Sequence, residues 1–295
     1  MIKAFFEKNY KKIIIIPALL LIISLVFLIS QYNSTGELFD RDVSLKGGIS
    51  ATVYTDKDFE ILDLEENIKN RLNNDVSVRK LRDFSSSSLL GYIIDIGDVN
   101  VKENLKITLE NILDLRLSEE NYSVNEVGSS LGDSFYKDMV KAVFIAFILM
   151  GIVVFIAFRN FIPSLAVILS ALLDISATLM VVNLLELKIS TAGIAAFLLV
   201  IGYSVDTDIL MTTKVLKRVE GGTTIERLIS SAKTGLTMTM TTFVALSIGY
   251  VVASSLVLKQ MFLIILIALI VDVISTYGMN AGILYWYKEG RRSKN

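Results

Sequence analysis

The 295-residue chain contains neither cysteine nor histidine. Disulfide bonds, thiol nucleophiles and metal sites built from thiolates or imidazoles are therefore excluded, and so is a Ser-His-Asp catalytic triad. The Gly47-Gly48 pair lacks the spacing of a phosphate-binding loop. We therefore expect neither a cofactor nor an enzymatic activity, and any folded domain outside a membrane must be stabilised by its own packing.

The chain also lacks a surplus of basic charge, because its formal net charge is -1. Its mean hydropathy of +0.59 is high for a soluble protein, yet 20% of its residues are charged. Membrane helices joined to a polar domain explain both values. Residues 31–138 contain 21 acidic and 12 basic residues, and the remainder contains 9 and 17. The acidic segment is typical of a solvated domain and the basic remainder of membrane edges, which leaves no basic face for nucleic acid.

Apolar runs predict six membrane-spanning helices. The first, Ile13–Ser30, follows four lysines and resembles a signal peptide, but it is long for one, and Gln31-Tyr32-Asn33 is a poor cleavage site. We therefore expect an uncleaved span within residues 1–30 and a domain over residues 31–138. Each further run is near the ~20 residues that cross the hydrocarbon core. Within residues 139–287, spans are expected at about 140–158, 161–182, 190–211, 234–257 and 260–284.

Lysine and arginine in the short loops predict the orientation. With six spans, the N-terminus, Arg159, the loop 212–233 and the tail 288–295 all lie on one side, and all carry basic residues. The loops on the other side carry few charges. We therefore expect a multi-pass protein of the cytoplasmic membrane with both termini in the cytosol and residues 31–138 outside. The segment Lys214–Ser231 is charged and amphipathic, which predicts that it lies along the inner membrane face.

The outside segment alternates between the two hydrophobic periods of strands and helices. The expected order is βαββαβ, which is typical of a ferredoxin-like α/β domain. The fold class is thus an all-α bundle of six transmembrane helices plus an extracytoplasmic α/β domain. Its elements are expected at Gly48–Tyr54, Asp58–Leu72, Asp75–Phe84, Leu89–Ile96, Val99–Leu117 and Tyr122–Val127, with a turn at Ser85–Ser88.

Four aspartates fall inside the expected spans, where ionisable groups are costly and are candidates for function. At ~1.5 Å per residue, Asp174 lies about 20 Å from the cytoplasmic end of its helix, and Asp206 about 8 Å from its own. We expect Asp174 to meet Asp272 at mid-depth. Asp206 or Asp208 is expected to reach Lys233 nearer the cytosol. The four aspartates and Lys233 are the candidates for ion coupling. A carboxyl group in lipid can bind and release protons near neutral pH.

Structural roles compete with functional ones at several of these positions. Asp208 points about 200° away from Asp206 around the helix, so a capping role is as plausible as coupling, and Asp272 is equally suited to a packing role. Lys233 is better explained as a topology charge than as a partner of a carboxylate. Asp206 and Asp174 are favoured for function. Thr234, Thr237 and Thr241 share one helix face, where hydroxyls usually join helices.

Three motifs of the chain are Leu45-Lys46-Gly47-Gly48, Val127-Gly128-Ser129-Ser130-Leu131-Gly132 and Gly202-Tyr203-Ser204-Val205-Asp206, the last of which contains the sequence G-Y-S. With these motifs the chain resembles the SecF family of accessory subunits of the Sec protein-export machinery. The resemblance covers nearly the whole chain and includes the span order, Arg159 and Asp174. In bacterial members an Asn and an Asp follow the G-Y-S motif, whereas Asp206-Thr207-Asp208 follows it here, and Lys233-Thr234 replaces an Arg-Thr pair. This set is similar to the archaeal branch.

The resemblance implies partners and a mechanism. It implies a SecD-like subunit of similar plan, a bundle related to the RND transporters, and action at the SecYE channel on exported polypeptides, driven by protons that pass the intramembrane acids. Two alternatives remain. A small-molecule RND-type exporter is one, although such chains are usually much longer. An intramembrane aspartyl protease is the other, although its Gly-x-Gly-Asp and Tyr-Asp motifs are absent.

Overall fold

A computed structural model describes residues 2–74, 76–82, 88–216, 222–253 and 255–292. Residues 85–87 of the turn expected at Ser85–Ser88, residues 217–221 of the loop 212–233 and residues 293–295 of the tail lie outside the described residues. The chain forms two compact units. The membrane unit comprises Met1–Asp40 and Val140–Asn295, and the sheet unit comprises Arg41–Met139.

The membrane unit consists of helices, and six helical segments are long and apolar enough to cross a membrane. This result confirms the predicted number of spans. The sixth span is formed by three consecutive elements, of which the middle one, η2, is a π-helix. The elements are α1 (Ile2–Thr35), α5 (Ser129–Phe158), α6 (Phe161–Leu184), α7 (Thr191–Leu216), α8 (Thr224–Val252), α9 (Leu256–Ile274), η2 (Ser275–Asn280) and α10 (Ala281–Arg292).

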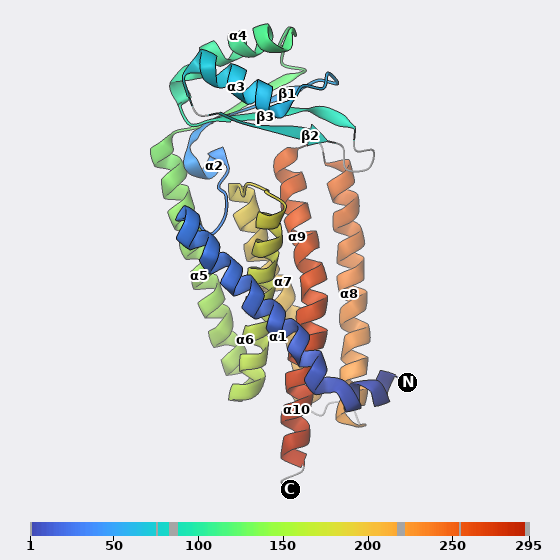
Figure 1. The fold of residues 1–295 in the computed structure, drawn as a ribbon. Helices are drawn as coiled ribbons and strands as arrows, with labels where there is room; N and C mark the ends of the chain where they lie inside the picture. Colours follow the sequence, from blue (N-terminus) through green and yellow to red (C-terminus); the bar gives the residue numbers. More distant parts are fainter. Residues whose placement is uncertain (1, 75, 83–87, 217–221, 254, 293–295) are drawn as a thin grey trace. The chain divides into compact units, whose positions relative to one another are not determined.

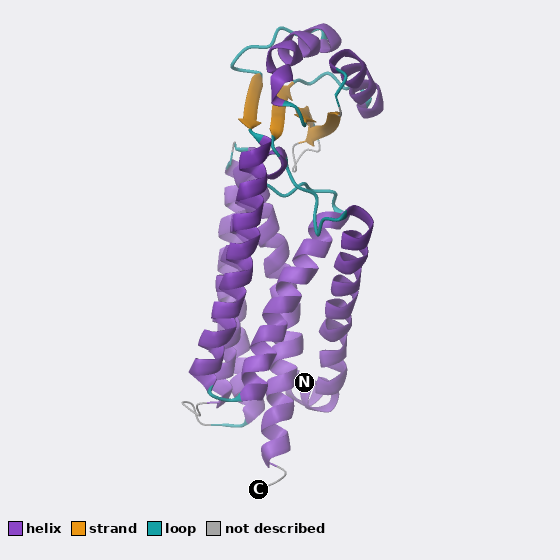
Figure 2. Ribbon diagram, turned by 90° about the vertical axis from the view of Figure 1, so that its left-hand side faces the viewer, coloured by secondary structure: helices purple, strands orange, loops and turns teal. Residues whose placement is uncertain are grey.

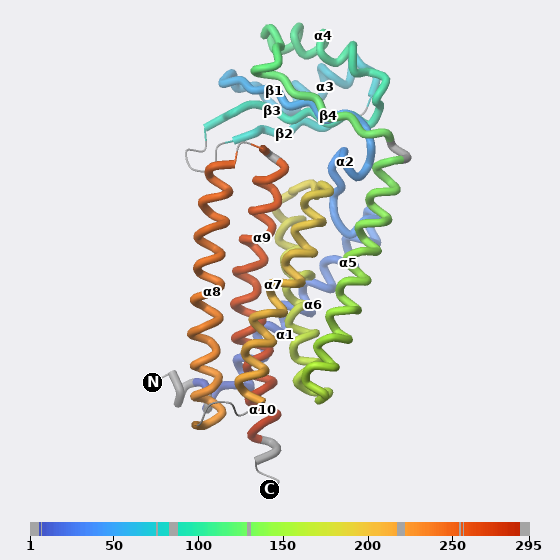
Figure 3. The backbone as a smooth tube through the Cα atoms, turned by 180° about the vertical axis from the view of Figure 1, so that it is seen from behind, coloured from blue at the N-terminus to red at the C-terminus, as the bar shows by residue number. Residues whose placement is uncertain are grey.

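Helices α6 and α7 form the centre of this unit. In their most apolar stretches 56% of the residues are buried, compared with 6% in α5. Helix α1 crosses the bundle obliquely (Figure 1) and packs on α6, η2 and α10. Helices α7, α8 and α9 pack on one another, as the view from behind shows (Figure 3). The central position of α6 and α7 decides which of their aspartates are shielded from lipid.

The helices extend further than their apolar runs predict. Helix α7 continues to Leu216 and α8 already begins at Thr224, so most of the loop expected over 212–233 is helical. The start of α8 is fixed by a capping box, in which the side chains of Thr223 and Glu226 bond each other's backbone N–H groups. Charged helix ends continue beyond the hydrocarbon core because their side chains reach water, and hydropathy alone does not register them.

The sheet unit contains a four-stranded antiparallel sheet in the order β2-β3-β1-β4, with helices on one face (Figure 2). Helices α3 and α4 bury their apolar sides on it, and the core includes Ile68, Leu109 and the fully buried Tyr92. The elements are α2 (Val43–Lys46), β1 (Gly48–Tyr54), α3 (Ile61–Leu72), β2 (Val76–Arg82), β3 (Leu89–Ile96), η1 (Val99–Val101), α4 (Lys102–Leu113) and β4 (Tyr122–Val127).

Helix α3 begins three residues later than the sequence pattern predicts, because the hydroxyl of Tyr92 holds the preceding segment. The Phe59 N–H donates to this hydroxyl at 2.5 Å, and the hydroxyl lies 3.2 Å from the carbonyl oxygen of Lys57. A buried tyrosine hydroxyl needs such partners. Residues 57–60 are therefore kept out of the helix by a tertiary contact that the helical period does not reveal.

The face of the sheet away from α3 and α4 carries a polar network. Asp95, which is buried, accepts from Ser50 Oγ at 2.7 Å and from Arg79 Nη2 at 2.8 Å. Asp42 lies 3.7 Å from Arg79 Nη2 and accepts from the N–H of Ser44 at the start of α2. Burial raises the pKa of Asp42, and the charge of Asp95 raises this pKa further.

Candidate ion-coupling site

Three carboxyl groups of the membrane unit converge in its interior. Asp174 on α6, Asp208 on α7 and Asp272 at the end of α9 are 0%, 0% and 1% exposed. Residues of η2 connect them by hydrogen bonds. An aspartate in the middle of a span is costly unless it is paired or protonated, so this arrangement is the main candidate for a functional site.

Two serine hydroxyls contact Asp174. Ser204 Oγ donates to Asp174 Oδ2 across the α6–α7 contact. Ser275 Oγ lies 2.5 Å from Asp174 Oδ1 and 3.1 Å from the carbonyl oxygen of Asp272. Ser204 is the serine of the Gly202-Tyr203-Ser204 motif, so this motif supplies a hydrogen-bond donor to the carboxyl group of Asp174 on α6.

A single hydroxyl joins the other two carboxyl groups. Thr276 Oγ1 lies 2.9 Å from Asp208 Oδ1 and 3.2 Å from Asp272 Oδ1. Asn280 Nδ2 also donates to Asp208 Oδ1, at 2.7 Å. The second oxygen, Oδ2, of both Asp208 and Asp272 is buried without a hydrogen-bond partner among the described residues.

The π-helical geometry of η2 explains why its hydrogen-bonding side chains face the same carboxyl cluster. In an α-helix, residues five apart lie about 140° apart around the axis, so Ser275 and Asn280 would point in different directions. In a π-helix the hydrogen bonds run from i to i+5, which places such residues about one turn apart. Ser275, Thr276 and Asn280 were not among the residues singled out from the sequence. Their signal is a run of polar residues in an otherwise apolar span.

The donors around the three carboxyl groups are neutral hydroxyls and an amide. No lysine or arginine is buried in the described part of the chain. Within those same residues, no group of acidic side chains is arranged to hold a metal ion. Three ionised carboxylates without a cation would be very costly in a medium of low dielectric constant. The geometry is therefore suited to holding protons.

The structure does not bring Asp206 and Lys233 into this cluster. Both side chains are exposed, and no ion pair joins Lys233 to Asp206 or Asp208 among the described residues. Asp206 is two residues from Asp208 and therefore lies on the opposite side of α7. The expectation that one of these aspartates reaches Lys233 is wrong for this conformation. The cluster instead contains Asp208, for which the sequence favoured no role.

Thr234, Thr237 and Thr241 of α8 are also exposed. The hydroxyls of Thr234, Thr237 and Thr241 donate to carbonyl oxygens of their own helix, at 3.2, 2.9 and 2.8 Å. In the described chain they join no second helix through these bonds, except that Lys214 Nζ donates to Thr234 Oγ1 at 3.4 Å.

Comparison with known proteins identifies the family. The family described as "Protein export membrane protein SecD/SecF, C-terminal" matches residues 108–290. The protein-export membrane protein SecF of Methanocaldococcus jannaschii is 38% identical over 97% of this chain and 99% of its own length. The chain belongs to the SecF family. A second SecF protein, from Pyrococcus furiosus, is 33% identical over 99% of this chain and 96% of its own length.

A solved structure shows the same fold. The crystal structure of SecDF, a translocon-associated membrane protein from Thermus thermophilus, matches with a TM-score of 0.73 and 18% identity. The match covers 96% of this SecF chain but 38% of the SecDF chain, so the present chain spans little more than a third of that protein.

Proposed function

We propose that the chain is a non-catalytic membrane subunit that assists Sec-dependent export of polypeptides through a SecYE channel. The observation that carries this proposal is the similarity to archaeal SecF proteins over nearly the full length of both chains. SecDF combines SecD and SecF in its name, and this chain spans 38% of it. This relation supports a SecD-like partner subunit. No observation on the described chain favours a small-molecule exporter or a protease.

The proposed coupling ion is the proton, and the hydroxyl of Thr276 provides the argument. This hydroxyl has one proton to donate, yet it lies within hydrogen-bond distance of both Asp208 Oδ1 and Asp272 Oδ1. If both carboxyl groups were ionised, one contact would join two oxygen atoms without a hydrogen. A proton on either carboxyl group satisfies both contacts, because that group then donates to Thr276.

The same reasoning applies to Asp174. The hydroxyl of Ser275 lies within reach of Asp174 Oδ1 and of the Asp272 carbonyl oxygen, which accepts hydrogen bonds but never donates them. A proton on Asp174 lets that carboxyl group donate to Ser275 while Ser275 donates to the carbonyl. This conformation thus fits two bound protons, one on Asp174 and one shared by Asp208 and Asp272, and release of either changes the hydrogen bonds of η2.

The exposed face of α7 is proposed to contact the partner subunit. Asp206 lies on this face within a membrane span, where a carboxylate facing lipid is costly. Gly202, one turn earlier, is exposed, and an added Cβ would meet no atom within 4 Å. Small residues on an open helix face allow another helix to approach closely. A SecD-like helix with a polar group facing Asp206 would shield this carboxyl group.

The orientation proposed for the chain places both termini in the cytosol and residues 31–138 outside. Its basis is the distribution of lysine and arginine, which favours the cytosolic side of a membrane. We also propose that the outside domain is ferredoxin-like, since its helices and strands follow the order βαββαβ and its strand order is β2-β3-β1-β4.

Labelling of single cysteines tests the orientation, because the chain has no cysteine of its own. Ser118 and Lys12 are both exposed. With an impermeant maleimide, Ser118→Cys is expected to react in intact cells, and Lys12→Cys only after the membrane is opened. The reverse pattern would refute the orientation.

Depletion and purification test the export function. Cells that depend on this chain are expected to accumulate the precursor of an exported reporter protein when it is depleted. The chain, purified under mild conditions, is expected to carry a SecD-like subunit with it. Normal export on depletion, together with purification free of any SecD-like protein, would contradict the proposal.

A further inference from the structure

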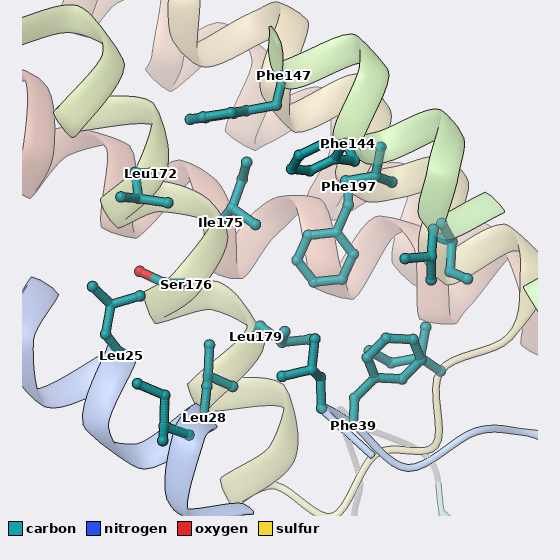
Figure 4. Close-up of a pocket in the computed structure, with 16 residues that line it drawn as sticks. Leu25, Leu28, Phe39, Phe144, Phe147, Leu172, Ile175, Ser176, Leu179 and Phe197 are labelled. Carbon is teal, nitrogen blue, oxygen red and sulfur yellow. The ribbon is translucent and has the colours of Figure 1, made fainter. Parts of the chain in front are cut away.

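The membrane unit contains an apolar cavity of about 470 Å³ that is separate from the carboxyl cluster. Its walls come from α1, the segment after α1, α5, α6 and α7 (Figure 4). The contributing residues lie where α1 and α6 end and where α7 begins, so the cavity is at one end of the bundle. Helix α5 packs on α6 and α7 through Met150, Val154 and Phe158, and its Val140–Phe147 segment borders the cavity, where Val143 and Phe147 also pack against this cluster.

The chemistry of the walls excludes a polar ligand. All sixteen lining residues are apolar except Ser176. The hydroxyl of Ser176 is already used, because it bonds Ser24 Oγ at 2.9 Å and the carbonyl oxygen of Leu173 at 3.3 Å. A water molecule in a cavity needs two to four polar partners, and apolar cavities of ~150 Å³ stay dry and take up benzene. A cavity about three times that size, with no free polar group in its walls, is suited to a hydrocarbon.

The cavity is continuous with the surface that faces the lipid. Ile29 on α1 and Phe144 on α5 line it, yet they are 59% and 65% exposed. Ile194 and Phe197 on α7 line its inner wall and are 3% and 6% exposed. In a multi-pass membrane protein the medium around the rim residues is acyl chains. A void at this position would forfeit dispersion contacts along its whole lining.

We propose that this cavity binds the hydrocarbon chain of a membrane lipid, which enters between α1 and α5 and reaches the inner wall at Ile194 and Phe197. The bound chain fills the space bounded by α1, α5, α6 and α7. The lipid thereby acts as a packing element between the first two spans. This inference depends on the membrane location of the chain and not on its role in export.

Photolabelling with a lipid tests the proposal on the full chain together with its partner subunit in nanodiscs. The probe is a phospholipid with a diazirine on its acyl chain, and labelled residues are identified by mass spectrometry. Ile194 and Phe197 are expected to be labelled although they are nearly buried, in addition to the lipid-exposed Ile152 on α5. Label on Ile152 without label on Ile194 or Phe197 would overturn the proposal. That result would mean that no acyl chain reaches the inner wall, either because a helix of the partner subunit fills the cavity or because the cavity is closed to lipid.

Substitutions that fill the cavity with a larger side chain provide a second test of the proposal. Ile175→Trp, on the α6 wall (Figure 4), is expected to abolish labelling of Ile194 and Phe197 and to leave Ile152 labelled. The matched control Ile148→Trp, on the exposed side of α5, is expected to change none of the three. Unchanged labelling of Phe197 in a folded Ile175→Trp protein would overturn the proposed path. If this variant does not fold, Ile175→Phe serves as a milder filling, and the wild-type pattern decides by itself.

Discussion

The substitution Asp208→Asn separates the chemical role of this carboxyl group from its structural one. The Oδ1 atom remains and still accepts from Thr276 and Asn280, while an amide nitrogen replaces the Oδ2 atom, which has no partner among the described residues. No existing hydrogen bond is lost, but the new amide N–H donors are buried without a partner among the described residues, so the free energy of unfolding is expected to fall by about 1–3 kcal/mol. Proton binding at this position is abolished.

The comparison variant Asp208→Leu removes the acceptor. Asn280 Nδ2 then keeps only a weak contact at 3.5 Å to the backbone oxygen of residue 208, and Thr276 retains Asp272 alone. A buried donor that loses its partner costs about 1–3 kcal/mol. The expected loss of stability is therefore also roughly 1–3 kcal/mol, visible as a lower midpoint of thermal unfolding in detergent. Asp208→Leu loses both contacts to Oδ1 that Asp208→Asn keeps.

The assay is export of a reporter protein in cells that depend on the variant, with the amount of assembled complex measured in parallel. Asp208→Asn is expected to assemble normally and to lower export to the level of cells without the subunit. Asp206→Asn, the same change on the exposed side of α7, is the matched comparison: it keeps a polar side chain at the proposed partner interface, and the complexes that assemble with it are expected to retain export. Wild-type export by an assembled Asp208→Asn complex would refute the coupling role of the cluster. Loss of export in Asp206→Asn alone would instead support the residue that the sequence favoured.

Three further outcomes are expected. Gly91→Ala should destabilise the sheet by more than about 2 kcal/mol, because Gly91 has a φ of +151° and an added Cβ would overlap the carbonyl oxygen of Val53. In the control Gly97→Ala the added Cβ meets open space, so the sheet should keep its stability. Hydrogen exchange of the β3 amides distinguishes the two variants. Gly202→Leu should leave the isolated chain as stable as wild type and reduce co-purification of the partner, and unaltered co-purification would argue against the α7 interface. Asp42→Asn should slow β1 amide exchange at neutral pH, because the pKa of Asp42 is raised in the folded state and ionisation of Asp42 therefore destabilises the fold. This gain in stability should decrease as the pH falls below the folded-state pKa and should be absent below the unfolded-state pKa.

The sequence predicts the sheet unit closely where local pattern and tertiary structure agree. Strands β1, β3 and β4 have the bounds that the alternation indicates, Gly48–Tyr54, Leu89–Ile96 and Tyr122–Val127. The short helix α2 and the late start of α3 were missed. Asp42 caps α2, and the buried Tyr92 restrains the segment before α3. Both features depend on contacts between residues that no single hydrophobic period connects.

The candidate site was harder to predict because the depth of a residue in a span does not specify whether its side chain faces the centre of the bundle or the lipid. Asp206 and Asp208 lie within two residues of each other, and their order along the helix gives no sign of which one faces the centre. In the structure α7 packs against α6, α8 and α9, and this packing buries Asp208 and leaves Asp206 exposed. A π-helix is likewise invisible to a hydropathy profile, although it supplies Ser275, Thr276 and Asn280.

The position of η2 between the carboxyl cluster and α1 would give the proposed proton binding a route to the rest of the chain. On one side its hydroxyl and amide groups hold Asp174, Asp208 and Asp272. On the other, Gly278 packs so closely on Pro17 of α1 that an added Cβ would lie 3.0 Å from the ring. A π-helix differs from an α-helix in which backbone bonds it makes, and coupling between distant groups requires an element with two discrete arrangements. Under the proposed function, release of a proton would change the hydrogen bonds that Ser275 and Thr276 make in the π form. Any return of η2 to α-helical geometry would reorient Gly278 and alter the surface on which α1 packs.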